Sequence, residues 1–404
     1  MNHMNSRTVV GLGIAAVAAI VIAAGISLSR KPVADAAQGA GVALPGLAEH
    51  VNEVTRISLT APGQKLIATL EKDGQGWNVK EKSGYRADAG KVREFLLRLS
   101  QSRLIEPKTA NEQRYAEIGV SDIGAADAKG LLIAIDGLPQ PAQLIVGIMN
   151  SRGDATYLRR AGDKQSWLAK GNLIPDKTAA NWLDKRIVDL PATRVRDVAW
   201  SRPDGKAARV FKAQPGDANY VVADLPKGRE PSSEFAANGE ATTLAGLNFD
   251  DVLPAAEAPP PADGKVYRAT FASFDGVVVE LVGWKQNDAF RAQFQARKDE
   301  AAVDAAVSAA QAKAKADWDA QQAAAGGDAA KPAATPPAAV ADPAKDKAER
   351  SAAVDAEVAE LSRRFSGWTF VLPAYKAASF DKTTDDFLKP LDGKKTEAKK
   401  PAGK

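Results

Sequence analysis

Residues 54–79, VTRISLTAPGQKLIATLEKDGQGWNV, contain the pattern that decides the fold of this chain. Apolar residues recur at every second position, as at Ile57 and Leu59, within three short runs. Pro62-Gly63 and the pair at 73–74 (Asp-Gly) separate these runs, and both pairs are typical of turns. Period-two alternation between turns predicts antiparallel strands, so we expect a three-stranded meander here.

A helix is expected directly after this meander. Asp88 is a suitable N-cap, and apolar residues follow it at helical spacing until the pattern stops before Pro107: Val92, Phe95, Leu96 and Leu99. Further strands are expected at 131–135, 144–148, 155–159 and 166–169, and a short helix at 178–185. This mixture of strands and helices predicts the α+β fold class.

The second half of the sequence resembles the first. Residues 195–200 match residues 54–59 at an offset of 141 positions. Three further pairs lie at offsets of 143, 147 and 136, in that order: Trp77 with Tyr220, Pro107 with Pro254, and Gly147 with Gly283. We therefore expect two similar sheet-plus-helix repeats in tandem.

A later pair of residues indicates an insertion in the second repeat. Trp167 matches Trp368 at an offset of 201, which requires about 60 extra residues between Gly283 and Gly367. Most of this interval is rich in Ala, Gln, Lys and Asp and favours helices, while residues 326–343 are rich in Ala and Pro. We expect a helical insertion at about 288–364. It is either a contact surface for a partner or a tolerated surface insertion, because long loops cost little entropy.

An uncharged run of 21 residues at 8–28, TVVGLGIAAVAAIVIAAGISL, precedes the globular part. As a helix it would span about 31 Å, which matches the hydrocarbon core of a bilayer. The alternative is a cleaved signal peptide, because Arg7 precedes the run and an A-x-A sequence follows at 34–36. The length of the run, and the position of Arg30 and Lys31 before that sequence, favour an uncleaved anchor.

These patterns divide the chain into five parts. They are a membrane anchor at 1–30, a linker at 31–52, a first α+β repeat at 53–192, a second repeat with its insertion at 193–388, and a lysine-rich disordered tail at 389–404. The tail is expected to be solvated, or else to contact anionic lipid or a partner. We expect a single-pass protein of the bacterial inner membrane with most of the chain in the periplasm.

Composition excludes several kinds of chemistry. The formal net charge is only +4 and basic residues are scattered among acidic ones, so nucleic-acid binding has little support. The chain has no cysteine, which excludes disulfides, thiolate catalysis and thiolate metal ligands. Its histidines, His3 and His50, lie before the anchor and at the end of the linker, where neither suits a catalytic triad or a zinc site. We expect no enzyme activity, no catalytic, cofactor-binding or metal-binding residues, and no cofactor.

Tryptophans suggest an alternative function. Six of them could line a sugar-binding groove: Trp77, Trp167, Trp182, Trp200, Trp284 and Trp368. Several recur at equivalent positions in both halves, so core packing is the simpler explanation. The alternative is a periplasmic glycan-binding protein or a carboxylate-dependent glycan hydrolase. The hydrolase would need two carboxylates about 5 to 9.5 Å apart in an aromatic-lined cleft.

Several short motifs, taken in order, resemble a known family. They are Gly76-Trp77-Asn78-Val79, Ala87-Asp88 at a helix start, Tyr115 followed by Gly119-Val120, the Leu-Ile-Val-Gly sequence at 144–147, and Thr156-Tyr157-Leu158-Arg159. With the anchor, they resemble the family catalogued as domain of unknown function 4340, closely over 54–198 and more loosely in the second half. The resemblance implies a membrane-anchored protein, often encoded beside the permease and ATPase of an ABC-2-type exporter, with no assigned active site.

The expected function is therefore binding rather than catalysis. We expect a non-enzymatic, membrane-anchored extracytoplasmic accessory or scaffolding subunit of an ABC-type transporter or another envelope complex. Its expected partners are the membrane, through one N-terminal helix, and an ABC-type permease or other envelope proteins, but not nucleic acid.

Overall fold

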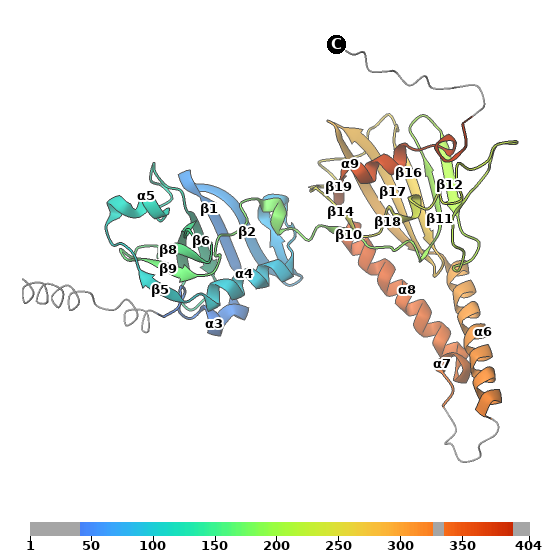
Figure 1. Ribbon diagram of the computed structural model, residues 1–404, viewed down its shortest axis with the longest axis horizontal. Helices are drawn as coiled ribbons and strands as arrows, with labels where there is room; N and C mark the ends of the chain where they lie inside the picture. Colours follow the sequence, from blue (N-terminus) through green and yellow to red (C-terminus); the bar gives the residue numbers. More distant parts are fainter. Residues whose placement is uncertain (1–40, 326–334, 391–404) are drawn as a thin grey trace, which may run out of the picture. The chain divides into compact units, whose positions relative to one another are not determined.

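The computed structural model describes residues 41–325 and 335–390 (Figure 1). The predicted anchor at 8–28 and the predicted tail from 391 onward lie outside these residues. Within the described ranges, no helix combines the length and the apolar character that crossing a bilayer requires. The chain divides into two compact units between Asp184 and Lys185. Both contain helices and antiparallel sheets, which confirms the α+β class.

The first unit is built on one antiparallel sheet of nine strands, in the order β4-β3-β2-β1-β6-β7-β8-β9-β5. The meander predicted at 54–79 supplies β1 to β3. The strands are β1 (Arg56–Ala61), β2 (Lys65–Asp73), β3 (Gly76–Val79), β4 (Tyr85–Arg86), β5 (Leu104–Pro107), β6 (Leu131–Asp136), β7 (Ala142–Met149), β8 (Ala155–Arg160) and β9 (Ser166–Lys170).

Helix α4 (Ala89–Gln101) covers one face of this sheet and agrees with the prediction. The Asp88 side chain accepts a hydrogen bond from the Lys91 amide at 3.0 Å, so it caps the helix as expected. The four apolar residues of the predicted stripe are all buried. The Phe95 and Trp182 rings pack edge-on, with their centroids 5.3 Å apart. Trp182 ends a short 3₁₀ turn, η5 (Ala179–Trp182), where a helix over 178–185 was expected.

Residues 41–52, which the sequence pattern assigned to the linker, are folded into the first unit. Helix α3 (Leu47–His50) and the 3₁₀ turn η1 (Val51–Glu53) lie here, and Leu47 is fully buried. The Arg160 guanidinium donates to the carbonyl oxygens of Val42 and Ala43 at 2.8 and 2.9 Å. A buried side chain and these two hydrogen bonds hold the segment against the sheet, so only residues 31–40 of the expected linker lie outside the described structure.

The second unit contains an antiparallel sheet of eight strands, in the order β13-β12-β11-β16-β17-β18-β19-β15, and a small sheet of β10 and β14. Its strands are β10 (Arg186–Val188), β11 (Val195–Ser201), β12 (Ala207–Phe211), β13 (Val221–Val222), β14 (Leu247–Asn248), β15 (Asp251–Pro254), β16 (Tyr267–Ser273), β17 (Val277–Gln286), β18 (Ala289–Lys298) and β19 (Trp368–Leu372).

The strand orders of the two large sheets agree from β3 and β13 onward. In both units, a main-chain hydrogen bond joins a segment near the end of the unit to an earlier segment. The Asp88 amide donates to the Trp182 carbonyl, and the Ser232 amide donates to the Phe387 carbonyl, each at 2.8 Å. The sequence match at an offset of 136, which pairs Gly147 with Gly283 and Leu144 with Glu280, is shifted by a residue. Leu144 is fully buried, whereas its match Glu280 points to the opposite face and is partly exposed, because neighbouring residues in a strand face opposite ways.

The inserted residues form a helical hairpin between β18 and β19 (Figure 1). It consists of α6 (Glu300–Ala325), α7 (Ala338–Ala341) and α8 (Pro343–Phe365). Asp342 caps α8 by accepting from the Lys345 amide at 3.0 Å. The predicted start of the insertion at 288 was too early, because residues 289–298 form strand β18. Phe290, Ala292 and Phe294 alternate into the core, and this period-two pattern prevails over the helix-favouring composition.

Candidate functional site

Three of the motifs that carry the family resemblance, at 115–120, 144–147 and 156–159, meet on one face of the first sheet. The 3₁₀ turn η4 (Glu112–Arg114) and helix α5 (Tyr115–Ile118) lie there. Tyr115, Val120 and Ile145 form a buried cluster, and Tyr157 packs against it. Burial raises the pKa of the Tyr115 hydroxyl. Residues spread over 40 positions therefore form one contact, which connects the segment after β5 to strands β7 and β8.

Arg159 is the central polar residue of this contact, and the sequence pattern did not reveal its role. Its side chain is 5% exposed. Its nitrogen atoms donate at 3.0, 3.0 and 2.5 Å to three oxygens: the Val120 carbonyl, the Asp163 carbonyl and an Asp122 carboxylate oxygen. Its guanidinium also lies 4.6 Å from the centre of the Tyr115 ring. Each of these donors is used within the unit, so Arg159 orients a segment rather than a ligand.

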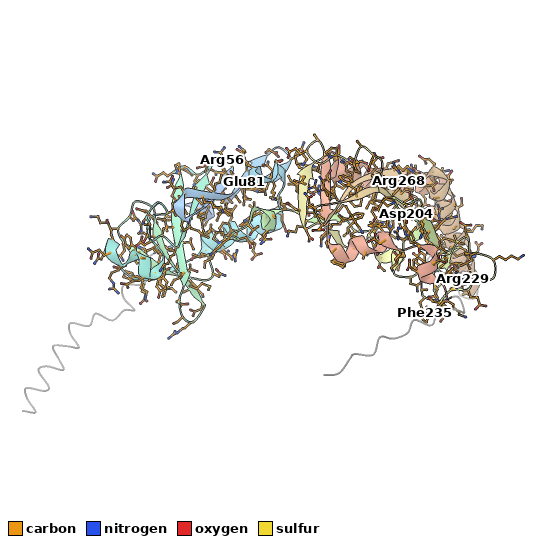
Figure 2. All side chains as sticks on the ribbon, turned by 90° about the horizontal axis from the view of Figure 1, so that it is seen from above. Arg56, Glu81, Asp204, Arg229, Phe235 and Arg268 are labelled. Atoms are coloured by element: carbon orange, nitrogen blue, oxygen red, sulfur yellow. The ribbon has the colours of Figure 1, made fainter. Side chains whose placement is uncertain are left out.

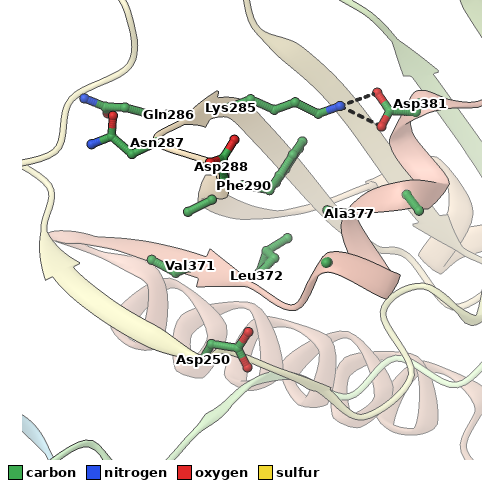
Figure 3. Close-up of a pocket in the computed structure, with 13 residues that line it drawn as sticks. Asp250, Lys285, Gln286, Asn287, Asp288, Phe290, Val371, Leu372, Ala377 and Asp381 are labelled. Carbon is green, nitrogen blue, oxygen red and sulfur yellow. Dashed lines mark hydrogen bonds and ion pairs between the residues drawn. The ribbon is translucent and has the colours of Figure 1, made fainter.

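A pocket of about 630 Å³ lies in the second unit, at the end of the sheet where the β17–β18 turn approaches α9 (Ala374–Ala377) (Figure 3). Its apolar lining includes Phe290 and Leu372, both almost fully buried. Its charged lining consists of Asp250, Lys285, Asp288 and Asp381. A pocket of this volume, with an apolar floor and few charged groups, is typical of a site for a small ligand or a partner side chain.

One edge of the pocket is held by an ion pair. The Lys285 ammonium donates to the two carboxylate oxygens of Asp381 at 2.9 and 2.7 Å, and the Tyr267 hydroxyl donates to one of them at 2.8 Å. Burial disfavours ionisation of Asp381, but the hydrogen bonds from Lys285 and Tyr267 outweigh it, so its pKa is lowered. The same hydrogen bond to Asp381 raises the pKa of Lys285. The rings of Phe290 and Phe380, which precedes Asp381, stack with their centroids 5.5 Å apart.

The other two carboxylates of the pocket have no such partner. Figure 3 shows Asp250 across the pocket from the Lys285–Asp381 pair, and Asp288 also lines the pocket. Asp288 follows Asn287 in the β17–β18 turn, and both have positive φ, at 60° and 51°. Asn and Asp tolerate this conformation in two-residue hairpin turns. Neither Asp250 nor Asp288 has a side-chain partner among the described residues, so the pocket carries excess negative charge.

Replacing Asp381 by asparagine is expected to destabilise the second unit by about 1–2 kcal/mol, because a partly exposed charged hydrogen-bond network is lost. The lowered pKa means that ionised Asp381 stabilises the fold above pH about 3.8, and that this contribution is lost as the pH falls through the folded-state pKa. Urea unfolding of wild type and variant should therefore differ at pH 7, and the difference should shrink as the pH falls below about 3.8 and through the lowered pKa of Asp381. The control Asp250→Asn should change stability by less than about 0.5 kcal/mol. A difference that does not shrink at any pH below about 3.8 at which the protein remains folded would rule out the charge as its source.

Among the described residues, none of three surface pockets brings several tryptophans together in one groove. Trp182, Trp200 and Trp284 are buried, and only Trp200 lines one of these pockets. That pocket has a single carboxylate, Asp224, whereas the pocket with three carboxylates has no tryptophan. The indole N–H of Trp200 donates to the Lys382 carbonyl at 2.9 Å. No pocket here combines a tryptophan with two carboxylates, and no group of His, Cys, Asp or Glu in residues 41–325 and 335–390 has the geometry of a metal site.

Sequence comparison identifies the family. Residues 77–269 match the domain of unknown function 4340. This part of the chain belongs to the family. The match to domain of unknown function 4340 begins in β3, crosses the boundary between the units and ends in β16, before the helical hairpin. It includes the Tyr115–Arg159 contact and, of the charged residues in the pocket, only Asp250. No curated protein and no solved structure shows significant similarity to the chain.

Proposed function

We propose that this protein is a non-enzymatic accessory or scaffolding subunit of an ABC-type transporter or another envelope complex, and that it acts by binding. In this proposal the run at 8–28 anchors the chain in the bacterial inner membrane as a single span, and the two units are periplasmic copies of one repeat. The shared strand order of the two sheets supports the duplication. The family resemblance supports the exporter context.

The observation that carries the proposal is the helical hairpin of the second unit. Its base belongs to the core: Phe365 packs against Phe294 at 5.4 Å, and the Arg194 guanidinium forms two hydrogen bonds of 2.9 Å with the Glu357 carboxylate. The same connection in the first unit, between β8 and β9, takes only residues 161–165. The fold can therefore be closed by a short turn.

The distal part of the hairpin lies outside the core of its unit. From residue 312 to the last side chain described in α6, residues are exposed or only partly buried. Lys313 and Lys315 form ion pairs of 2.9 and 3.0 Å with Asp317 and Asp319, each within the helix. Such pairs stabilise an exposed helix by only about 0.3–0.5 kcal/mol each. An ordered, charged helix that its own fold does not need provides a surface for a partner.

Trimming this distal part tests the proposal. A short Gly-Ser link replaces residues 313–341, because the Gln311 side chain already donates to the Pro343 carbonyl at 2.8 Å and the two ends lie close together. Affinity capture from native membranes should return transporter or envelope subunits with the full chain, and at least tenfold less of them with the trimmed chain. The thermal midpoints of the two proteins should agree, since the base of the hairpin is kept.

Two results would contradict this account in different ways. Equal capture by the full and trimmed chains would make the distal hairpin a tolerated surface insertion. Capture of no transporter or envelope subunit by either chain would remove the support for an accessory role.

A further inference from the structure

We propose that the lysine-rich segment 391–404 of this chain docks into the acidic pocket of its own second unit. The segment lies outside the described residues, and the pocket is the 630 Å³ cavity lined by Asp250, Asp288 and Asp381. This contact is made within the chain, so it does not depend on the identity of any partner.

Charge complementarity favours this occupant. The segment LDGKKTEAKKPAGK contains five lysines against two acidic residues. In the pocket, the only ammonium group is that of Lys285, and it is already bonded to Asp381. Asp250 and Asp288 are exposed and have no side-chain partner among the described residues, so they can receive lysine ammonium groups. The alkyl part of a lysine can meanwhile lie on the apolar lining formed by Phe290 and Leu372.

The start of the segment is fixed close enough for docking. Lys389 forms an ion pair of 2.6 Å with Glu230, and Arg229, labelled in Figure 2, donates to the Lys389 carbonyl at 2.9 Å. Asp381 at the pocket precedes Pro390 by nine residues, so the two are at most about 32 Å apart. Lys399 and Lys400 follow Pro390 by nine and ten residues, so they can reach at most about 32 and 36 Å from it. The segment is therefore long enough to bring a lysine pair to the pocket.

Cross-linking in the full chain tests this docking. Because the natural sequence has no cysteine, Ala378→Cys on the pocket lining and Ala398→Cys in the segment create the only thiol pair. The measured quantity is the rate of intramolecular cross-linking by a short bis-maleimide, with the product located by mass spectrometry. Asp250→Asn combined with Asp288→Asn, in this background, should slow the reaction about three- to tenfold, because two ionic contacts to the segment are lost. Adding 0.5 M salt should slow the unsubstituted pair similarly, since exposed charges are screened.

A matched control separates specific docking from general charge effects. Asp263 is an acidic residue of the second unit that does not line the pocket, and Asp263→Asn should leave the cross-linking rate unchanged. Circular dichroism should show that all variants stay folded. If the pocket variants cross-link as fast as the unsubstituted pair, or if Asp263→Asn slows the reaction equally, the segment does not dock in this pocket.

Discussion

Replacing Arg159 by methionine is expected to destabilise the first unit by about 2–4 kcal/mol, because two main-chain carbonyl oxygens lose their hydrogen bonds from a buried guanidinium. Methionine keeps most of the side-chain length but supplies no donor. The carbonyl oxygens of Val120 and Asp163 would then lose the hydrogen bonds that satisfy them, and the Tyr115 ring would lose its contact with the guanidinium. The segment between β5 and β6 should therefore detach from the sheet before the whole unit unfolds.

Urea unfolding and hydrogen exchange would measure this effect. The Val120 amide donates to the Tyr115 carbonyl at 3.0 Å, so its exchange rate reports directly on the segment. We expect its protection to fall by at least a hundredfold in the variant, while amides in the second unit stay unchanged. Arg152 is an exposed arginine in the neighbouring turn, and Arg152→Met should change stability by less than about 0.5 kcal/mol. Equal effects of the two substitutions would show that the buried network of Arg159 does not stabilise the unit.

Replacing Gly147 by alanine should destabilise the first unit by about 3 kcal/mol or more, because the added methyl group has no space. A Cβ atom at this position would overlap the Ile118 carbonyl oxygen, and would lie 3.0 Å from both the Gly119 carbonyl oxygen and a Val120 methyl carbon. The nearest atom belongs to the main chain, so a rotamer change cannot relieve the overlap. Strand β7 and the segment after α5 would have to move apart.

Gly74 provides the matched control within the same unit. It lies in the turn between β2 and β3, and a Cβ atom there would meet nothing within 4 Å. Gly74→Ala should therefore change the free energy of unfolding by no more than about 1 kcal/mol. Parallel urea titrations of the two variants would measure the difference. Similar stability of both variants would mean that the close approach of Ile118 to β7 is not required for folding.

Local sequence signals predicted the elements that depend on near neighbours. The cap and apolar stripe of α4 act within a few residues, so Asp88 and Phe95 identified this helix correctly. Alternation likewise identified β1 and β6. Strand β18 was missed because alanine and glutamine favour helices, and only its place between β17 and β19 selects the extended form.

These local signals could not predict contacts between distant segments. Residues 41–52 look like a linker until Leu47 is seen to be buried in the first unit. The motifs at 115–120, 144–147 and 156–159 follow one another in the sequence, but their spacing does not show that Arg159 lies against Val120. The pocket combines residues from before β15, from the β17–β18 turn and from the segment after β19. No sequence motif marks it.

By itself, the sequence determined the α+β class, the α4 helix, the strands of the first meander and the family. It determined these because alternation, caps and turns act over a few residues, and because ordered motifs identify relatives. The tertiary structure alone decided which segments Arg159 joins on the first sheet, where the helical hairpin begins, and which charges line the pocket of the second unit. These features depend on chain segments as far apart as Asp250 and Asp381, which are 131 residues apart, and only the packed sheets bring such segments together.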